Sequence, residues 1–110
     1  MNTIEWLIST YEEIYPGSED LKVRPRIKCN DGFSMSVQAS YSCYCEPRYT
    51  LKNCNYTSAE IGFPSEREPL IIGYAETPEY PTETVYPYTP IELIDSVIKK
   101  HGGIAGDVKC

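Results

Sequence analysis

The sequence predicts an α+β fold: an antiparallel β-sheet of about four to five strands, with an N-terminal and a C-terminal helix packed on one face. Three observations lead to this prediction. Apolar and polar residues alternate on both sides of a turn at 30–32, and apolar residues recur at helical spacing near the start and near the end of the chain. The chain has 110 residues without an internal repeat or linker, so we expect one domain over 1–110. Its predicted parts are an N-terminal helix at 1–16, a β-sheet region at 22–88, a C-terminal helix at 89–102 and a flexible tail at 103–110.

The first predicted element is a helix from Asn2 to Tyr15. Asn2 is a favourable N-cap, and Glu5, three residues later, completes a capping box. Pro16 and Gly17 end the helix. Six apolar residues fall on one stripe at helical spacing, and we expect this stripe to face the core: Ile4, Leu7, Ile8, Tyr11, Ile14 and Tyr15.

A β-hairpin follows at residues 23–41. A two-residue loop would place apolar residues opposite polar ones, whereas a three-residue loop at 30–32 puts both apolar sets on one inner face and pairs Ile27 with Met35. Gly32 supplies the positive φ that the last loop position needs. Pro25 cannot donate a hydrogen bond, so the first strand is expected at a sheet edge. The residues predicted to point inward are Val23, Pro25, Ile27, Cys29, Phe33, Met35, Val37, Ala39 and Tyr41.

Further strands are predicted after a loop at residues 42–56. Residues 57–63 alternate, with Ala59, Ile61 and Phe63 expected inward. Residues 70–75 are apolar on both sides, which is typical of a covered strand. Residues 82–88 predict a last short strand, limited by a proline at position 87.

The second helix is predicted at residues 89–101. Thr89 is expected as its N-cap and Pro90 as its first residue, with Glu92 completing the capping box. Gly102 is expected to end the helix in a left-handed conformation. One apolar face should be buried, and it consists of Ile91, Ile94, Val97 and Ile98.

Charge is segregated along a chain whose net charge is −6. Residues 22–52 hold six basic and two acidic residues, whereas residues 57–95 hold eight acidic residues and one arginine. Such a chain suits a small anionic ligand better than a long polyanion, so nucleic acid is an unlikely partner by composition. No apolar run is long enough to span a membrane and no signal peptide is visible, which indicates a cytoplasmic protein with reduced thiols.

The outer face of the hairpin is the candidate binding site. The three-residue loop places Arg26 opposite Ser36, Arg24 opposite Gln38 and Lys28 opposite Ser34. Guanidinium, ammonium, hydroxyl and amide groups suit an anion such as phosphate or carboxylate. The alternative interpretation is a solvated polar face whose edge cations discourage aggregation. The candidate ligand-binding residues are Arg24, Arg26, Lys28, Ser34, Ser36, Gln38, Tyr44 and Arg48.

No catalytic or metal-binding pattern stands out. The cysteines contain a single C-x-C and no second knuckle, so free thiols are favoured over a zinc site built from Cys43, Cys45 and Cys54 with Cys29 or His101. A Cys45/His101 nucleophile pair lacks a readable third group. Phosphate-loop, dinucleotide-binding and metalloprotease motifs are absent from the sequence. We therefore expect a non-enzymatic protein without a cofactor.

Several segments, in the same order, resemble a family of small proteins encoded in phage and prophage genomes. These segments are RPRIKCNDGFSMSVQAS, YCEPR, EIGFPSEREPLIIGYAE, TVYPY and VIKKHGGI, and they span about residues 22 to 104. The family brings no established biochemistry to this chain. By analogy, the resemblance implies a protein of the infected or lysogenic bacterial host's cytoplasm that counters host defence by stoichiometric binding.

Three functions follow as hypotheses. In the first, the hairpin face sequesters an anionic, nucleotide-type immune signal. In the second, the acidic segment 60–83 binds the basic channel of a CRISPR-Cas effector, as an anti-CRISPR protein would. In the third, the chain is a structural or regulatory phage component that forms homo-oligomers.

Overall fold

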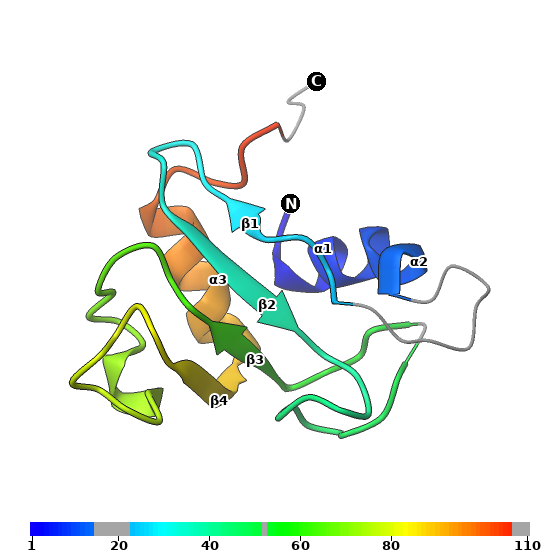
Figure 1. The fold of residues 1–110 in the computed structure, drawn as a ribbon. Coiled ribbons are helices and arrows are strands. Elements are labelled where there is room, and N and C mark those ends of the chain that lie inside the picture. The colour runs from blue at the N-terminus through cyan, green and yellow to red at the C-terminus, as the bar shows by residue number, and fades with distance from the viewer. Residues whose placement is uncertain (15–22, 52, 107–110) are drawn as a thin grey trace.

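The computed structural model describes residues 1–14, 23–51 and 53–106. Within them, four antiparallel strands form one sheet in the order β1-β2-β3-β4, flanked by helices from both ends of the chain (Figure 1). This confirms the predicted α+β class and an antiparallel sheet. The elements are α1 (Thr3–Ser9), α2 (Tyr11–Ile14), β1 (Ile27–Lys28), β2 (Ser34–Gln38), β3 (Ser58–Gly62), the 3₁₀ helix η1 (Ile72–Tyr74), β4 (Val85–Pro90) and α3 (Ile91–Lys100).

The N-terminal helix begins as predicted and breaks once. Asn2 and Glu5 form the reciprocal capping box. The helix then divides at Thr10, whose hydroxyl and backbone N–H both donate to the Trp6 carbonyl oxygen, at 2.8 and 3.0 Å. The expectation that Ile8 packs inward is wrong, since half of it is exposed. The expectation for Tyr15 lies outside the described residues.

The hairpin register is confirmed. Ile27 pairs with Met35, and the Cys29 N–H donates to the Phe33 carbonyl oxygen at 2.8 Å. Gly32 has φ +96°, the left-handed conformation that favours glycine. β1 is only two residues long, however, and before it the predicted alternation is wrong: Val23 is 76% exposed and Arg24 is buried.

The segment between β3 and β4 differs from the prediction. Residues 70–75, expected as a covered strand, form turns and the short helix η1. Of these six residues, only Ile71, which precedes η1, is fully buried. Phe63 was expected inward but is half exposed, because its φ of +50° turns the chain out of the sheet directly after β3. β4 ends at Pro90, two residues beyond the predicted end.

The C-terminal helix keeps its predicted buried face, but its start is different. Thr89 belongs to β4 and bonds the Tyr86 carbonyl oxygen, so it is not the N-cap; Pro90 occupies that position without a side-chain cap. The predicted glycine ending is confirmed. The N–H groups of Gly102 and Gly103 donate to the carbonyls of Lys99 and Ile98, which is a Schellman motif.

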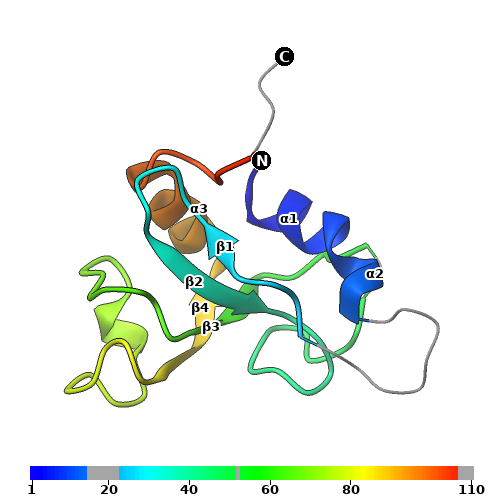
Figure 2. The same ribbon diagram turned by 45° about the horizontal axis from the view of Figure 1, so that its top comes forward.

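The first part of the predicted flexible tail is ordered against the hairpin, which corrects that expectation for residues 103–106. Ile104 bridges Cys29, and the Ala105 N–H donates to the Lys28 carbonyl oxygen at 2.6 Å. Figure 2 shows this red segment running beside β1. Residues 107–110 lie outside the described part of the chain.

Both sheet edges are thereby covered. The 103–106 segment follows β1, and on the other side the Tyr88 N–H of β4 donates to the Tyr44 carbonyl oxygen at 3.0 Å. Covered edges discourage strand addition by another chain. The core lies between the inner side of the sheet and α3, which runs behind the sheet in Figure 1. Packing of both helices on one face stays a prediction. None of the helices in the described residues is long and apolar enough to cross a membrane.

Candidate binding surface

Arg24, the first residue of the predicted binding face, is buried in a structural role. It is only 2% exposed. Its guanidinium donates to the Thr10 hydroxyl at 3.0 Å, to the Ala39 carbonyl oxygen at 2.9 Å and to the Leu7 carbonyl oxygen at 3.1 Å. Burial lowers the Arg24 pKa, while the nearby Cys54 and Tyr56 groups favour its charge. The prediction that Arg24 lies on the outer surface is therefore wrong.

Gln38 faces Arg24 as predicted, but it bonds the backbone. Its Oε1 accepts from the Arg24 N–H at 2.8 Å, and its Nε2 donates to the Arg24 carbonyl oxygen at 2.9 Å. These two bonds replace the ladder that a longer β1 would have made. Nε2 also donates to the Ser36 hydroxyl at 3.0 Å. Gln38 is thus buried and occupied, contrary to the exposed position expected from the sequence.

Arg26 remains on the outer face and reaches along it. Its Nε and Nη2 donate to the Ser34 hydroxyl at 3.3 and 3.1 Å, and Nη2 also donates to the Phe63 carbonyl oxygen at 2.6 Å. The side chain therefore contacts Ser34 diagonally rather than the Ser36 side chain opposite it. Lys28 is exposed on β1. Arg26 stabilises the end of β3 while part of its guanidinium stays accessible.

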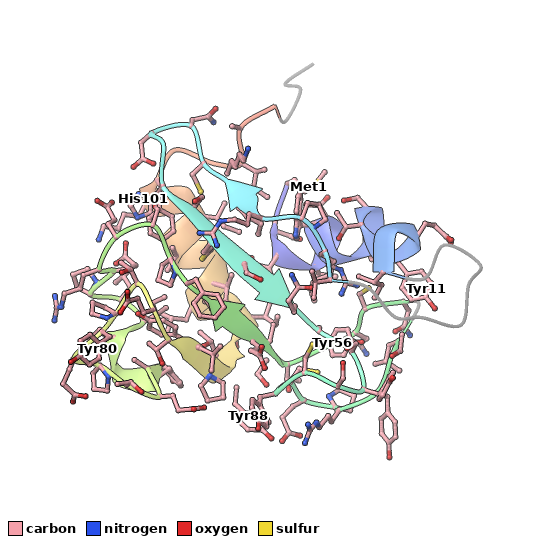
Figure 3. All side chains as sticks on the ribbon, viewed as in Figure 1. Met1, Tyr11, Tyr56, Tyr80, Tyr88 and His101 are labelled. Carbon is pink, nitrogen blue, oxygen red and sulfur yellow. The ribbon has the colours of Figure 1, made fainter. Side chains whose placement is uncertain are left out.

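Tyr44 and Arg48, both predicted binding residues, come together with a residue that was not predicted. The Arg48 guanidinium lies 5.0 Å from the centre of the Tyr44 ring, and the Tyr88 ring is tilted against Tyr44 at 5.9 Å. The two tyrosines are 41% and 42% exposed. We call Tyr44, Arg48 and Tyr88 the aromatic–arginine cluster. Figure 3 shows Tyr88 at the lower edge of the sheet.

Backbone contacts hold this cluster in place. The Tyr44 N–H donates to the Glu60 carboxylate at 3.0 Å, and the Tyr44 carbonyl oxygen accepts from the Tyr88 N–H. Tyr88 has φ +52°, which is unusual for a residue with a side chain. It lies where the register of β3 on β4 shifts, a bulge that re-aims a side chain. The sequence gives no clear sign of this shift, so Tyr88 was missed.

The outer face of the sheet next to the cluster is shallow. Ser36, Gly62 and Val85 lie side by side across β2, β3 and β4. A Cβ at Gly62 would contact the Ser36 Cβ at 3.6 Å, so the absence of a side chain at Gly62 leaves the surface flat along this row. Ser36 and Val85 are half-buried, and no described helix crosses this side in Figure 1. The face suits a flat partner better than an enclosed small molecule.

A small cavity lies elsewhere, beside Arg24. It measures about 60 Å³ and is lined by Ile14, Val23, Arg24, Gln38, Ser40, Ser42 and Cys43. Its volume has room for a few water molecules, whereas drug-sized ligands occupy sites of hundreds of Å³. The polar groups of Arg24 and Gln38 already have protein partners. The cavity is therefore too small and too fully bonded for a nucleotide.

A buried charge network around His101 was not predicted. The His101 Nδ1 lies 2.6 Å from the Asp31 carboxylate, and Nε2 lies 2.7 Å from the Glu68 carboxylate. Lys100 adds an ion pair to Glu68 at 2.9 Å. Phe33 stacks on the imidazole at 4.0 Å, nearly parallel to it. The network joins three segments that are far apart in the sequence, so periodicity carries no signal for it.

The pKa values of His101, Glu68 and Asp31 are shifted from their ordinary values. Burial lowers the His101 pKa, but the bonds to Glu68 and Asp31 outweigh it and raise the pKa overall. Burial raises the Glu68 pKa, but bonds from the Leu70 N–H, His101 and Lys100 lower it overall. The Phe33 N–H, followed by His101, lowers the Asp31 pKa. The charged forms of all three groups are therefore favoured.

The thiols are not arranged as a metal or nucleophile site in the described part of the chain. Cys29, Cys43 and Cys45 are free thiols, and no group of metal-ligating side chains was found among the described residues. Both ring nitrogens of His101 face carboxylates, so the hypothetical pairing with Cys45 is not made. Burial, with Asp31 nearby, raises the pKa of Cys29 to about 11.

Comparison with known proteins found no matching family model, curated protein or solved structure.

Proposed function

We propose that this chain is a phage-encoded, non-enzymatic anti-defence protein that binds a host defence protein stoichiometrically. Its contact surface would be the aromatic–arginine cluster and the outer sheet face beside it. The observation that carries this proposal is the exposed cluster in which Arg48 lies over the Tyr44 ring and the Tyr88 ring is tilted against it, with the backbones of both tyrosines held by hydrogen bonds. The phage setting rests on the resemblance described above.

The composition of the cluster favours a protein partner. Tyrosine and arginine are enriched among the residues that dominate binding energy at protein interfaces. Solvated rings and a guanidinium gain most when a partner excludes water from them. Because Tyr44 and Tyr88 are held by main-chain hydrogen bonds, little ordering free energy is lost on binding.

The geometry weakens the proposal of a sequestered nucleotide-type signal. Arg24 and Gln38 are occupied within the fold, so the cations of the predicted ligand-binding set that stay on accessible positions are Arg26, Lys28 and Arg48. The outer face is shallow, and the small cavity has no room for a base. A flat protein surface is the better match to these features.

A second candidate surface is the connector between β3 and β4. Its exposed carboxylates at Glu66, Glu76, Glu79 and Glu83 lie near the exposed rings of Tyr74 and Tyr80 along the chain. Such a surface suits the basic channel of a CRISPR-Cas effector, and this is the anti-CRISPR version of the same proposal. We define Glu76, Glu79 and Glu83 as the acidic set for the test below.

The experiment measures phage growth on bacteria that carry one defence system and express this chain. We expect the wild-type chain to protect the phage from the defence system and to co-purify with its target at a one-to-one ratio. A cluster variant, Tyr44→Ala with Arg48→Glu and Tyr88→Ala, should lose both by at least about tenfold, since removing interface anchors costs more than 1 kcal/mol each.

Two comparisons make the outcome decisive. A variant with the acidic set changed to glutamine should retain binding if the cluster is the contact surface, and should lose it if the basic-channel version holds. Folding of both variants is checked by circular dichroism. Protection that persists in the cluster variant would reject the proposed surface. Calorimetry with cyclic and linear nucleotides tests the signal version directly, and we expect no binding below high-micromolar concentrations.

A further inference from the structure

The imidazole of His101 contacts Asp31, Glu68 and Phe33, and Lys100 pairs with Glu68. Asp31 comes from the hairpin loop, Glu68 from the connector after β3, and Lys100 from the end of α3. The Phe33 ring covers one face of the imidazole. His101 is itself buried, so its polar atoms depend on these partners rather than on water.

The number of protons on the ring follows from the two contacts. Each ring nitrogen lies within 2.7 Å of a carboxylate oxygen that carries negative charge. A neutral imidazole has one N–H and would place a lone pair against one of these oxygens. The imidazolium has two N–H groups and satisfies both carboxylates. The geometry therefore fits the charged ring, and the raised His101 pKa agrees with it.

We propose that His101 is a protonation-dependent clasp for the hairpin loop: loss of one ring proton releases the Asp31 side chain, while Glu68 stays bound to Nε2–H. This inference is independent of the proposed binding surface. It assigns a pH-sensitive contact to the hairpin loop.

The contact to Asp31 is the one that breaks, because losing the ring costs this exposed carboxylate less free energy than it costs the buried Glu68. Its side chain is 47% exposed and can exchange the ring for water. Glu68 is 1% exposed, and its second oxygen accepts from the Leu70 N–H at 2.9 Å and from Lys100. Removing the proton next to Glu68 would leave a buried charge without one of its donors, which costs more. The remaining proton therefore stays on Nε2.

Other titratable groups near the clasp do not change which contact breaks when the ring loses a proton. Lys100 pairs with Glu68 at 2.9 Å. The Cys29 thiol, beside Asp31, has its pKa raised to about 11 and stays protonated. Among the described residues, Asp31, Glu68, Lys100 and Cys29 are the titratable groups whose interactions reach the ring or its carboxylates.

Release of Asp31 should leave the loop attached to the C-terminal segment. The Asp31 N–H still donates to the His101 carbonyl oxygen at 3.3 Å. Asn30 donates from its backbone to Gly103 at 3.0 Å and from its side chain to Gly102 at 2.7 Å. The expected change is local to the hairpin loop, and the fold persists on both sides of the transition.

A nuclear magnetic resonance titration of the purified chain tests the clasp. His101 is the sole histidine in the sequence, so its ring signals are assigned without ambiguity. Between about pH 5 and about pH 9 we expect the ring to titrate above the ordinary histidine value of about 6.5. The amide of Phe33, which donates to Asp31 Oδ1 at 2.9 Å, should shift with the same midpoint.

Matched variants separate the clasp from a general effect of net charge. Asp31→Asn should move the His101 midpoint to lower pH and abolish the linked shift at Phe33. Glu66→Gln removes one exposed acidic charge from the connector and should leave both midpoints in place. A wild-type midpoint at or below the ordinary value, or an unchanged midpoint in Asp31→Asn, would overturn the proposal. The proposal would also be overturned if the Phe33 amide still shifted with the His101 midpoint in the Asp31→Asn variant, which lacks the carboxylate.

Discussion

The Nη2 group of Arg24 donates to the carbonyl oxygen of Leu7 at 3.1 Å, which ties the chain before β1 to helix α1. The same guanidinium bonds Thr10, the residue at which the N-terminal helix divides. Carbonyl and hydroxyl groups that a helix break leaves without regular partners are thus satisfied by one buried cation. Arg24 is part of the fold rather than of a binding surface.

We predict that Arg24→Ala lowers the free energy of unfolding by about 3 kcal/mol. The change removes hydrogen bonds from a charged donor and leaves buried carbonyls without partners, and both effects are costly. Urea denaturation followed by circular dichroism measures it. The matched control is Arg48→Ala, which removes an exposed arginine and should cost less than about 0.5 kcal/mol. Equal losses in the two variants would contradict this assignment.

The hairpin shows which structural features can be predicted from the sequence and which cannot. Its register depends on which residues must be buried together, and Ile27 pairs with Met35 as the period of two requires. The same reasoning fails at Val23 and Arg24, where the ladder ends and Gln38 bonds the backbone in its place. An alternating pattern cannot report where a strand stops pairing, so a buried arginine was placed on the surface.

The candidate sites show a similar division. Tyr44 and Arg48 are only four residues apart, so their proximity could be inferred from the sequence. Tyr88 joins them through a register shift between β3 and β4, which the sequence does not reveal. Asp31, Glu68 and His101 meet only because three turns converge. Contacts of that kind depend on the path of the chain, and residue spacing holds no information about it.

Phe63 offers a direct test of backbone strain. Its φ is +50°, where glycine is favoured over residues with a Cβ by about 1 kcal/mol or more. We predict that Phe63→Gly is more stable than Phe63→Ala by about 1 kcal/mol, although glycine is the more flexible residue when unfolded. Thermal unfolding of both variants measures the difference. Greater stability of the alanine variant would show that the left-handed conformation is not kept in solution.

Stability should depend on pH in a way set by the His101 network. The His101 pKa is raised in the fold, so its contribution is complete below about pH 6.5 and is lost as pH rises through the folded pKa. The Asp31 and Glu68 pKa values are lowered, so their contributions are complete above about pH 4.5 and are lost as pH falls through the folded values. We expect maximal stability between these limits.

The variant His101→Gln isolates the alkaline side of this profile. Urea midpoints of wild type should fall between about pH 6.5 and about pH 8, and the variant should show a flat profile there at lower overall stability. Lys99→Gln, which removes an exposed neighbouring charge, should keep the wild-type slope. A slope that persists in His101→Gln would assign the pH dependence to another group.

Thiol reactivity should report the environment of Cys29. The thiolate is the reactive form, and burial beside Asp31 raises the pKa of Cys29 to about 11 while leaving it 3% exposed. We predict that iodoacetamide at about pH 8 modifies Cys29 at least about tenfold more slowly in the folded chain than in urea, because the reagent meets a buried, protonated thiol. Peptide mass spectrometry over time gives the rate at each cysteine.

Cys43 is only partly buried and serves as the internal comparison. Burial raises its pKa as well, so it should react slowly but ahead of Cys29. Faster labelling of Cys29 than of Cys43 in the native protein would show that the pairing of residues 103–106 with the hairpin opens in solution, because the bridge from Ile104 to Cys29 is part of that pairing.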